Sequence, residues 1–102
     1  MSVASIIRDQ IGIRALFMIG AKNLVAKEQA LQFNVMRNKS GANRVTVLLT
    51  PSDTYRVTFS TFRLSSKTEV GYTNNIKAEY DDVYAESLHD VISEATGLAL
   101  RL

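Results

Sequence analysis

Two runs of alternating apolar and polar residues, separated by a proline-containing turn, constrain the fold of this chain most strongly. In residues 44–49 every second side chain is apolar, and the same pattern returns in residues 55–59. Alternation with a period of two is typical of strands that bury one face. Between the runs, Pro51 has the fixed φ that suits the second position of a turn. The sequence therefore predicts a β-hairpin within residues 44–64.

Near the end of the second run the alternation shifts by one position. Phe62 and Leu64 take the phase that Arg56 holds earlier in the strand. One inserted residue produces such a shift, so a bulge near residues 60–61 is one interpretation. The other is that the strand ends there and Phe62 begins a loop that folds back over the sheet.

Composition indicates one globular domain that spans residues 1–102, because the chain is 46% hydrophobic and has the length of an ordinary domain. Without cysteine there is no disulfide or thiolate site, and a single histidine excludes a metal cluster built on imidazole and sulfur. Residues 6–19 are apolar in places, but Arg8, Asp9 and Arg14 interrupt them. This segment resembles neither a signal peptide nor a membrane span, so we expect a soluble, intracellular protein.

Before the hairpin, the pattern predicts a helix and two strands. Apolar residues recur every fourth position in residues 2–11, which fits an amphipathic helix capped by Ser2 and stopped at the following glycine. Residues 13–19 are apolar at odd and even positions alike, apart from Arg14, and a glycine precedes and follows them. This favours a strand buried on both faces over a continuation of the helix. Residues 20–29 form a polar connector, and residues 31–35 alternate as a second strand.

After the hairpin, residues 68–80 predict either one bent strand or two strands that turn at residues 74–75. Asp82 has the position of an N-cap for a final helix, and Gly97 the position of its C-cap. The apolar stripe of that helix has spacings of three and four, and consists of Tyr84, Leu88, Val91, Ile92 and Ala95.

These elements predict an α+β fold. It has a short N-terminal helix, an antiparallel sheet of about five strands, and a C-terminal helix packed on one sheet face. Beyond that helix, Leu98, Leu100 and Leu102 alternate with other residues. A leucine-rich tail seldom points into water, so we expect it either to pair as a strand or to lay its three leucines on a neighbouring surface.

The sequence offers little for catalysis. It has no nucleophile elbow, phosphate loop or dinucleotide fingerprint. His89, three residues after Glu86, could act as a base, but an exposed helix histidine is the favoured interpretation. Helix capping and a solvated face explain the acids better than a metal site does, so we expect no enzyme, cofactor or metal. The acids are Glu79, Asp81, Asp82, Glu86, Asp90 and Glu94.

Charge is divided unevenly along the chain. Residues 1–50 have seven Lys or Arg against two acids, a net charge of +5, whereas residues 51–102 have five against eight, a net charge of −3. Such a division is compatible with an oppositely charged partner, with attraction between copies, or simply with a solvated surface of uneven charge. Candidate residues for binding nucleic acid are Arg37, Lys39, Arg44 and Arg56, although alternating arginine and threonine on a solvated sheet face explains the pattern more simply.

Several short patches of sequence, taken together in their order along the chain, resemble a group of small uncharacterised proteins from tailed bacteriophages and viral metagenomes. The sequence departs from that group at Asp81-Asp82 and Ala99, and has extra residues between Arg63 and Ile76. The resemblance implies a phage origin, in the host cytoplasm or on a virion, and no activity or functional residue. The patches are Gly20-Ala21-Lys22-Asn23-Leu24-Val25, Leu31 with Phe33, residues 43–49, Asp53-Thr54-Tyr55 with Val57 and Phe59, Val83-Tyr84-Ala85-Glu86 with Leu88, and Thr96-Gly97-Leu98.

The leading functional hypothesis is a non-enzymatic binding or assembly module that self-associates as a dimer, through a strand edge or through Leu98, Leu100 and Leu102. Two-fold pairing is the commonest way to cover such surfaces. The alternative is a small nucleic-acid-binding protein that uses a basic sheet face and the 37–44 loop. A further phage or host protein is the remaining partner class.

Overall fold

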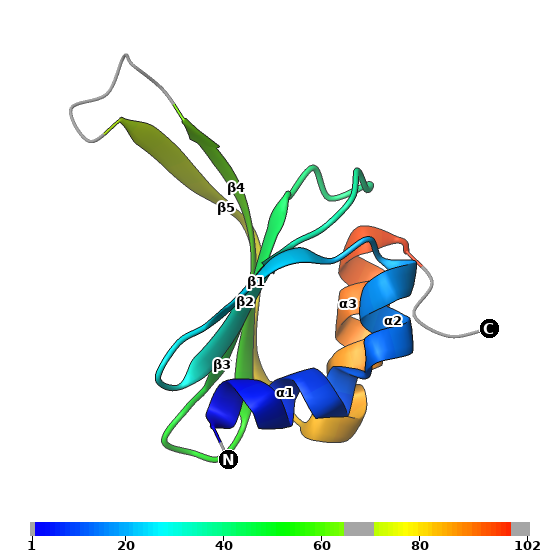
Figure 1. The fold of residues 1–102 in the computed structure, drawn as a ribbon, viewed down its shortest axis with the longest axis vertical. Coiled ribbons are helices and arrows are strands. Elements are labelled where there is room, and N and C mark those ends of the chain that lie inside the picture. The colour runs from blue at the N-terminus through cyan, green and yellow to red at the C-terminus, as the bar shows by residue number, and fades with distance from the viewer. Residues whose placement is uncertain (1, 65–70, 99–102) are drawn as a thin grey trace.

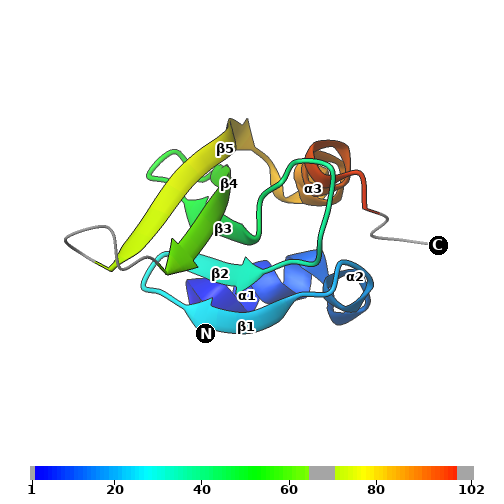
Figure 2. The same ribbon diagram turned by 90° about the horizontal axis from the view of Figure 1, so that it is seen from above.

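Helices at both ends of the chain cover one face of a single β-sheet (Figure 1, Figure 2). The computed structural model describes residues 2–64 and 71–98. It confirms the predicted α+β fold, with a short N-terminal helix, five antiparallel strands and a C-terminal helix on the sheet. The elements are α1 (Val3–Ile11), α2 (Ile13–Met18), β1 (Lys22–Ala26), β2 (Ala30–Asn34), β3 (Arg44–Leu49), β4 (Tyr55–Leu64), β5 (Tyr72–Val83), the 3-10 turn η1 (Ala85–Ser87) and α3 (Leu88–Thr96).

The strands follow one another across the sheet in the order β1-β2-β3-β4-β5, and every neighbouring pair is antiparallel. β3 and β4 form the predicted hairpin, in which Val47 lies opposite Val57. The backbone N–H of Thr50 donates to the carbonyl of Thr54 at 2.9 Å and closes the turn. Side chains therefore alternate between the core and the opposite face, as the sequence indicates.

The predicted bulge at residues 60–61 of the hairpin strand is wrong, because β4 continues without a break to its end. The irregularity lies in its partner. Phe59 pairs with Ala78 and Ser60 with Ile76, so the extra residue, Lys77, belongs to β5. Since β4 keeps its alternation, Phe62 lies on the face of the sheet away from the helices. The alternative of a loop that begins at Phe62 is equally wrong.

The core lies between the sheet and the helices. Ile7 and Ile11 of α1 and Leu88 and Ile92 of α3 are all at most 1% exposed. Full burial of one such side chain contributes about 1.5–3 kcal/mol to the free energy of folding. These residues pack against the inward-facing side chains of the sheet, which are Leu31, Phe33, Val45, Val47, Val57 and Phe59.

The predicted strand at residues 13–19 is instead the short helix α2. Gly12 has a φ of +92°, which lets the chain turn sharply between α1 and α2 rather than end in a loop. Ala15 and Leu16 then face the core, while Ile13 and Phe17 face outward. The sheet obtains its remaining strand, β1, from the segment expected to be a polar connector.

In residues 68–80, the described part is one continuous strand rather than a hairpin, because Asn74 and Asn75 lie within β5 opposite Phe62 and Thr61. Residues 68–70 lie outside the described residues. Of the two alternatives for this segment, the bent single strand agrees with the structure.

The final helix begins later than predicted. Asp82 belongs to β5, where its φ of +57° marks a second irregularity, and α3 begins at Leu88 after a 3-10 turn. Tyr84 is 59% exposed and does not join the apolar stripe. Gly97 ends the helix with a φ of +74°, so the predicted C-cap is confirmed. None of the helices in the described ranges is long and apolar enough to cross a membrane.

Candidate binding surfaces

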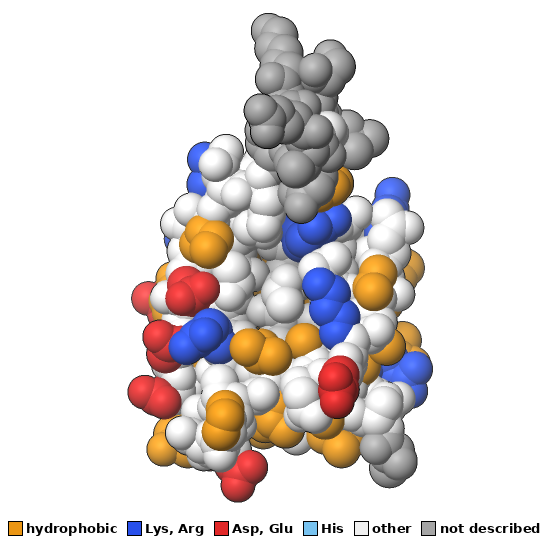
Figure 3. Space-filling model, turned by 90° about the vertical axis from the view of Figure 1, so that its left-hand side faces the viewer, with side chains coloured by type: hydrophobic (Ala, Val, Ile, Leu, Met, Phe, Trp, Pro, Cys, Tyr) orange, Lys and Arg blue, Asp and Glu red, His pale blue; other side chains and the backbone are white. Residues whose placement is uncertain are grey.

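The face of the sheet opposite the helices, here called the open face, is covered by mixed side chains. Acidic side chains gather along one edge, while basic and hydrophobic side chains are scattered over the rest (Figure 3). The hydroxyl of Thr58 donates to Glu79 across β4 and β5 at 3.2 Å. Cross-strand polar pairs of this kind are ordinary for a solvated antiparallel sheet.

Arg56 is engaged with a carboxylate of its own chain. Its Nε donates to the Oδ1 of Asp81 at 2.5 Å, on the open face. This hydrogen bond, and the charge of Asp81, raise the pKa of Arg56 above its ordinary value. Arg56 stays charged, and a phosphate that binds it would have to compete with Asp81.

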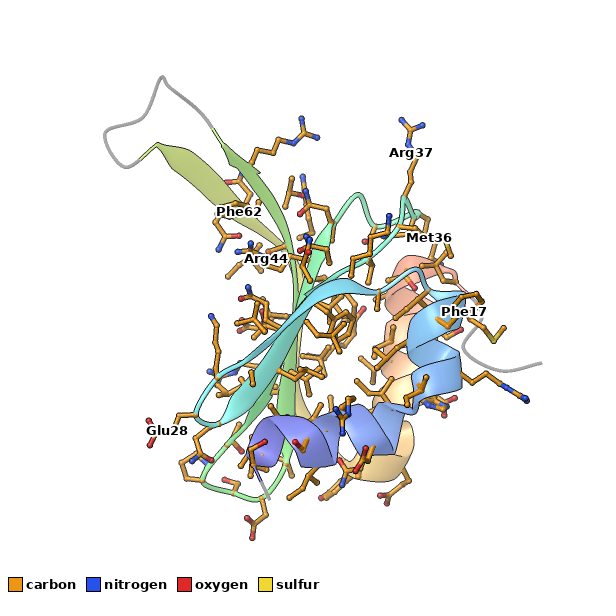
Figure 4. The ribbon with its side chains drawn as sticks, in the orientation of Figure 1. Phe17, Glu28, Met36, Arg37, Arg44 and Phe62 are labelled. Atoms are coloured by element: carbon orange, nitrogen blue, oxygen red, sulfur yellow. The ribbon has the colours of Figure 1, made fainter. Side chains whose placement is uncertain are left out.

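Arg44 also lies on the open face, where its guanidinium stacks on Phe62 (Figure 4). The Cζ atom is 3.9 Å from the ring centroid, a cation–π geometry. Its Nε is buried and has no hydrogen-bond partner among the described residues. Because β4 keeps its alternation, the aromatic ring reaches the open face without the predicted bulge.

Lys39 and Arg37 lie on the loop between β2 and β3, not on a strand of the open face. The backbone N–H of Lys39 donates to the carbonyl of Thr96 at 3.2 Å, and its side chain passes Gly97 at the end of α3. Arg37 is exposed on the loop between β2 and β3 (Figure 4). The structure therefore does not bring Arg37, Lys39, Arg44 and Arg56 together.

A hollow of about 420 Å³ lies between this loop and the outer end of β4. Arg37 lines it from the loop, and Arg63 from β4. Arg63 is not among the predicted candidate residues, and the unbroken course of β4 is what places it at the notch. The sequence holds no signal that would have placed it, because the apolar phase shifts at Phe62 although the strand itself is unbroken.

His89 forms a hydrogen bond between two helices. Its Nε2 lies 2.5 Å from the carbonyl oxygen of Ile11, which joins α3 to the end of α1. In the described ranges, 2–64 and 71–98, no three His, Asp or Glu side chains come together in a way that could hold a metal ion. The acids of α3 instead lie along its outer side, because Leu88 and Ile92 face the core.

The predicted self-association residues are only partly described. Leu98 packs against the core of its own chain, which leaves little of it for a partner. Leu100 and Leu102 lie outside the described residues. The other predicted surface, a strand edge, exists at β1 and at β5, but both strands have irregular register with their neighbours. Bulges and charges are the usual means by which proteins prevent edge pairing.

An apolar surface on α2 was not foreseen. Ile13 is 76% exposed and Phe17 is 84% exposed, one helical turn apart on the outer side of α2. Met36 lies beside the end of this helix, where its N–H donates to the carbonyl of Ile19 at 3.1 Å, and it is 43% exposed. Figure 4 shows Phe17 and Met36 at the outer end of α2. Reading residues 13–18 with a helical period would have revealed this patch.

Comparison with known proteins identifies no relative: no family model, no curated protein and no solved structure matches this chain.

Proposed function

We propose that this protein is a non-enzymatic binding module that self-associates as a dimer through the side of the molecule formed by α2 and α3. The observation that carries the proposal is the exposure of Ile13 and Phe17 on the outer side of α2. Isolated apolar residues on a surface are normal, but here two large ones share one helical face, and Met36 lies beside the end of the same helix. Such patches mark interaction sites.

The size of the patch indicates a weak dimer. Burial of one large apolar side chain contributes about 1.5–3 kcal/mol, and a two-fold interface buries Ile13 and Phe17 from each copy. This gives about 6–12 kcal/mol, against an association cost of about 4–15 kcal/mol. The most favourable combination is a net gain of about 8 kcal/mol, which corresponds to a dissociation constant of about 1 μM, so we expect a dimer no tighter than this, one that dissociates on dilution.

Charge favours a second copy as the partner. Arg14 is exposed beside the apolar patch of α2, while Glu86, Asp90 and Glu94 lie on the outer side of the neighbouring η1–α3 segment. Both views of the fold place α2 and α3 on the same side of the molecule (Figure 1, Figure 2). A two-fold axis would set α2 of each copy against α3 of the other, so that opposite charges meet twice. An interface between identical surfaces needs this self-complementarity.

An assembly role agrees with the phage resemblance of the sequence, since a small self-associating protein could act in the infected cell or on a virion. The strand edges support the proposal less, because their irregular register interrupts the row of backbone groups that a neighbouring strand would need.

Sedimentation analysis from low to high micromolar concentration tests the proposal. The wild-type protein should pass from monomer to dimer, and Phe17→Asp should stay monomeric. Ile76→Asp is the matched control, because Ile76 is 61% exposed on β5, away from α2, and should leave the dimer unchanged. A monomer at every concentration, or equal effects of the two variants, would contradict self-association through α2.

A charge-swap experiment tests the two-fold arrangement itself. In Arg14→Glu, and separately in Glu94→Lys, like charges would meet twice across the interface, so each variant alone should dimerise poorly. When the two variants are mixed, a heterodimer pairs residue 14 of each copy with a residue 94 of opposite charge in the other copy. A heterodimer should therefore form. Failure of the mixture to associate would argue against pairing of α2 with α3.

A further inference from the structure

A polar notch lies at the end of the molecule where the loop after β2 meets the outer end of β4. We infer that this notch binds a phosphate group, through the guanidinium groups of Arg37 and Arg63. Its volume of about 420 Å³ is within the range of about 300–1,000 Å³ that is typical of small-ligand sites. The inference does not depend on self-association, because Ile13 and Phe17, the exposed apolar residues of α2, do not line the notch.

The wall formed by β4 is fixed by Asn43. Its side-chain Nδ2 donates to the carbonyl of Phe62 at 2.9 Å, and its Oδ1 accepts from the N–H of Phe62, also at 2.9 Å. The amide thus pairs with the outer part of β4, as a neighbouring strand would. Because Phe62 is held toward the open face, Arg63 is turned to the opposite side, where it lines the notch.

The wall formed by the loop is fixed by Asn38. Its Nδ2 donates to the carbonyl of Met36 at 2.8 Å and to that of Ala42 at 2.9 Å, while its Oδ1 accepts from the N–H of Ser40 at 3.0 Å. These bonds order the loop around Arg37, whose exposed side chain extends from the rim (Figure 4). Both arginines therefore rise from backbone that is held in place before any ligand binds, which lowers the entropy cost of binding.

The described part of the notch carries positive charge from two arginines. Neither Arg37 nor Arg63 forms an ion pair with a described residue, whereas Arg56 is bound to Asp81 and Arg8 lies 3.6 Å from Asp9. Among the described residues that line the notch there is no acid. Arg44 lies on the open face and is not part of it. Arg37 and Arg63 line one hollow from its two walls, and the guanidinium group suits the planar, bidentate hydrogen bonding of phosphate oxygens.

A phosphate group could reach this site on a nucleic-acid strand or on a free nucleotide. A strand would give a salt-dependent affinity, because each phosphate contact releases counterions. With a slope of about −0.7 per contact, the two arginines alone should weaken binding about sevenfold when the salt concentration rises about fourfold.

Fluorescence anisotropy with a labelled single-stranded oligonucleotide of mixed sequence, at low and moderate salt, tests the inference, alongside calorimetry with a nucleoside triphosphate. Arg37→Ala/Arg63→Ala should lose binding of whichever probe the wild-type protein binds, and for the oligonucleotide the salt slope should shrink by about 1.4. The matched control is Lys22→Ala/Lys27→Ala, which removes the same charge from exposed positions on and beside β1.

The two probes distinguish the source of the phosphate. Oligonucleotide binding with the expected slope assigns the notch to a nucleic-acid strand, and saturable binding of the nucleotide alone assigns it to a free nucleotide. Arg37→Lys/Arg63→Lys keeps the charge and should retain only part of the affinity, because lysine lacks the bidentate geometry. If the wild-type protein binds neither probe, or if the arginine and lysine deletions weaken binding equally, the inference is wrong.

Discussion

The Nε2 atom of His89 lies 2.5 Å from the carbonyl oxygen of Ile11, so the only imidazole of the chain connects α3 to the last residue of α1. The last carbonyls of a helix have no partner within the helix and need one from elsewhere. Here a side chain distant in sequence supplies it. The two helices that cover the sheet are thereby joined at the point where the chain turns into α2.

Replacement of His89 should therefore lower stability. His89→Ala removes the donor and should reduce the free energy of unfolding by about 1–3 kcal/mol, because a half-buried carbonyl is left without its partner. His89→Gln keeps a donor and should lose less. Urea denaturation measures both values, and an unchanged midpoint for His89→Ala would show that this bond contributes nothing to the folded state.

The contribution of the two hydrogen bonds between Asn43 and Phe62 to stability should be measurable in the same way. Asn43→Ala breaks two hydrogen bonds of 2.9 Å, and we expect it to destabilise the fold by about 1–3 kcal/mol. The N–H of Phe62 should also exchange faster with solvent. Asn34→Ala is a suitable control, since Asn34 is half-buried on β2 and its side chain has no hydrogen bond to a described residue. Equal losses of stability in the two variants would show that the hydrogen bonds between Asn43 and Phe62 contribute no more than an ordinary side chain.

Tyr55 should make the stability depend on alkaline pH. Burial raises the pKa of its phenol, whose hydroxyl donates to Gln10 of α1. The folded state therefore favours the neutral phenol, and this contribution is complete below the ordinary pKa of about 10. It is lost as the pH rises through the higher folded pKa.

Urea denaturation at neutral pH and above pH 10 should show a steeper alkaline loss of stability in the wild-type protein than in Tyr55→Phe, which has no ionisable group at this position. Tyr84→Phe is the control, because Tyr84 is 59% exposed and should behave as the wild-type protein does. A parallel pH dependence in wild type and Tyr55→Phe would contradict the assignment.

Substitution at two glycines distinguishes the energetic cost of a positive φ from the cost of a steric contact with the new Cβ. Gly97 and Gly41 have φ values of +74° and +77°, so alanine should cost about 1–2 kcal/mol at either position. Only at Gly97 would the new Cβ meet a neighbour, the Cδ of Lys39, at 3.0 Å. Gly97→Ala should therefore be the more destabilising variant in thermal unfolding, and Lys39→Ala in the same chain should remove the difference. Equal losses at the two glycines would show that Lys39 moves aside freely.

The sequence predicted those elements that bury one face in a regular pattern. β3, β4 and α3 each have one apolar side, and that side meets the core. β1 escaped prediction because all five of its residues are exposed, so no alternation marks it as a strand. Residues 13–18 were misassigned because Ile13 and Phe17 are apolar and yet exposed, which imitates a strand buried on both faces.

The candidate surfaces were harder to predict, because they depend on which side of an element each residue faces. An extra residue assigned to β4 places Arg63 on the wrong side of the sheet, whereas the same residue on β5 leaves it in the notch. Arg56 illustrates a second limit. Its alternation with threonine indicated a free cation, but Asp81 lies on a strand distant in sequence, and only the pairing of β4 with β5 brings the two together.

The position of α3 after the whole sheet has a consequence for synthesis on the ribosome. Each strand can pair with the one before it as it emerges, but Leu88 and Ile92 reach the core only when α3 itself has left the exit tunnel. Until then, the apolar side of β3 and β4 is only partly covered, and nascent chains on neighbouring ribosomes could associate through it. Nascent chains in which α3 is still inside the tunnel should therefore associate more readily than chains in which α3 has reached the sheet.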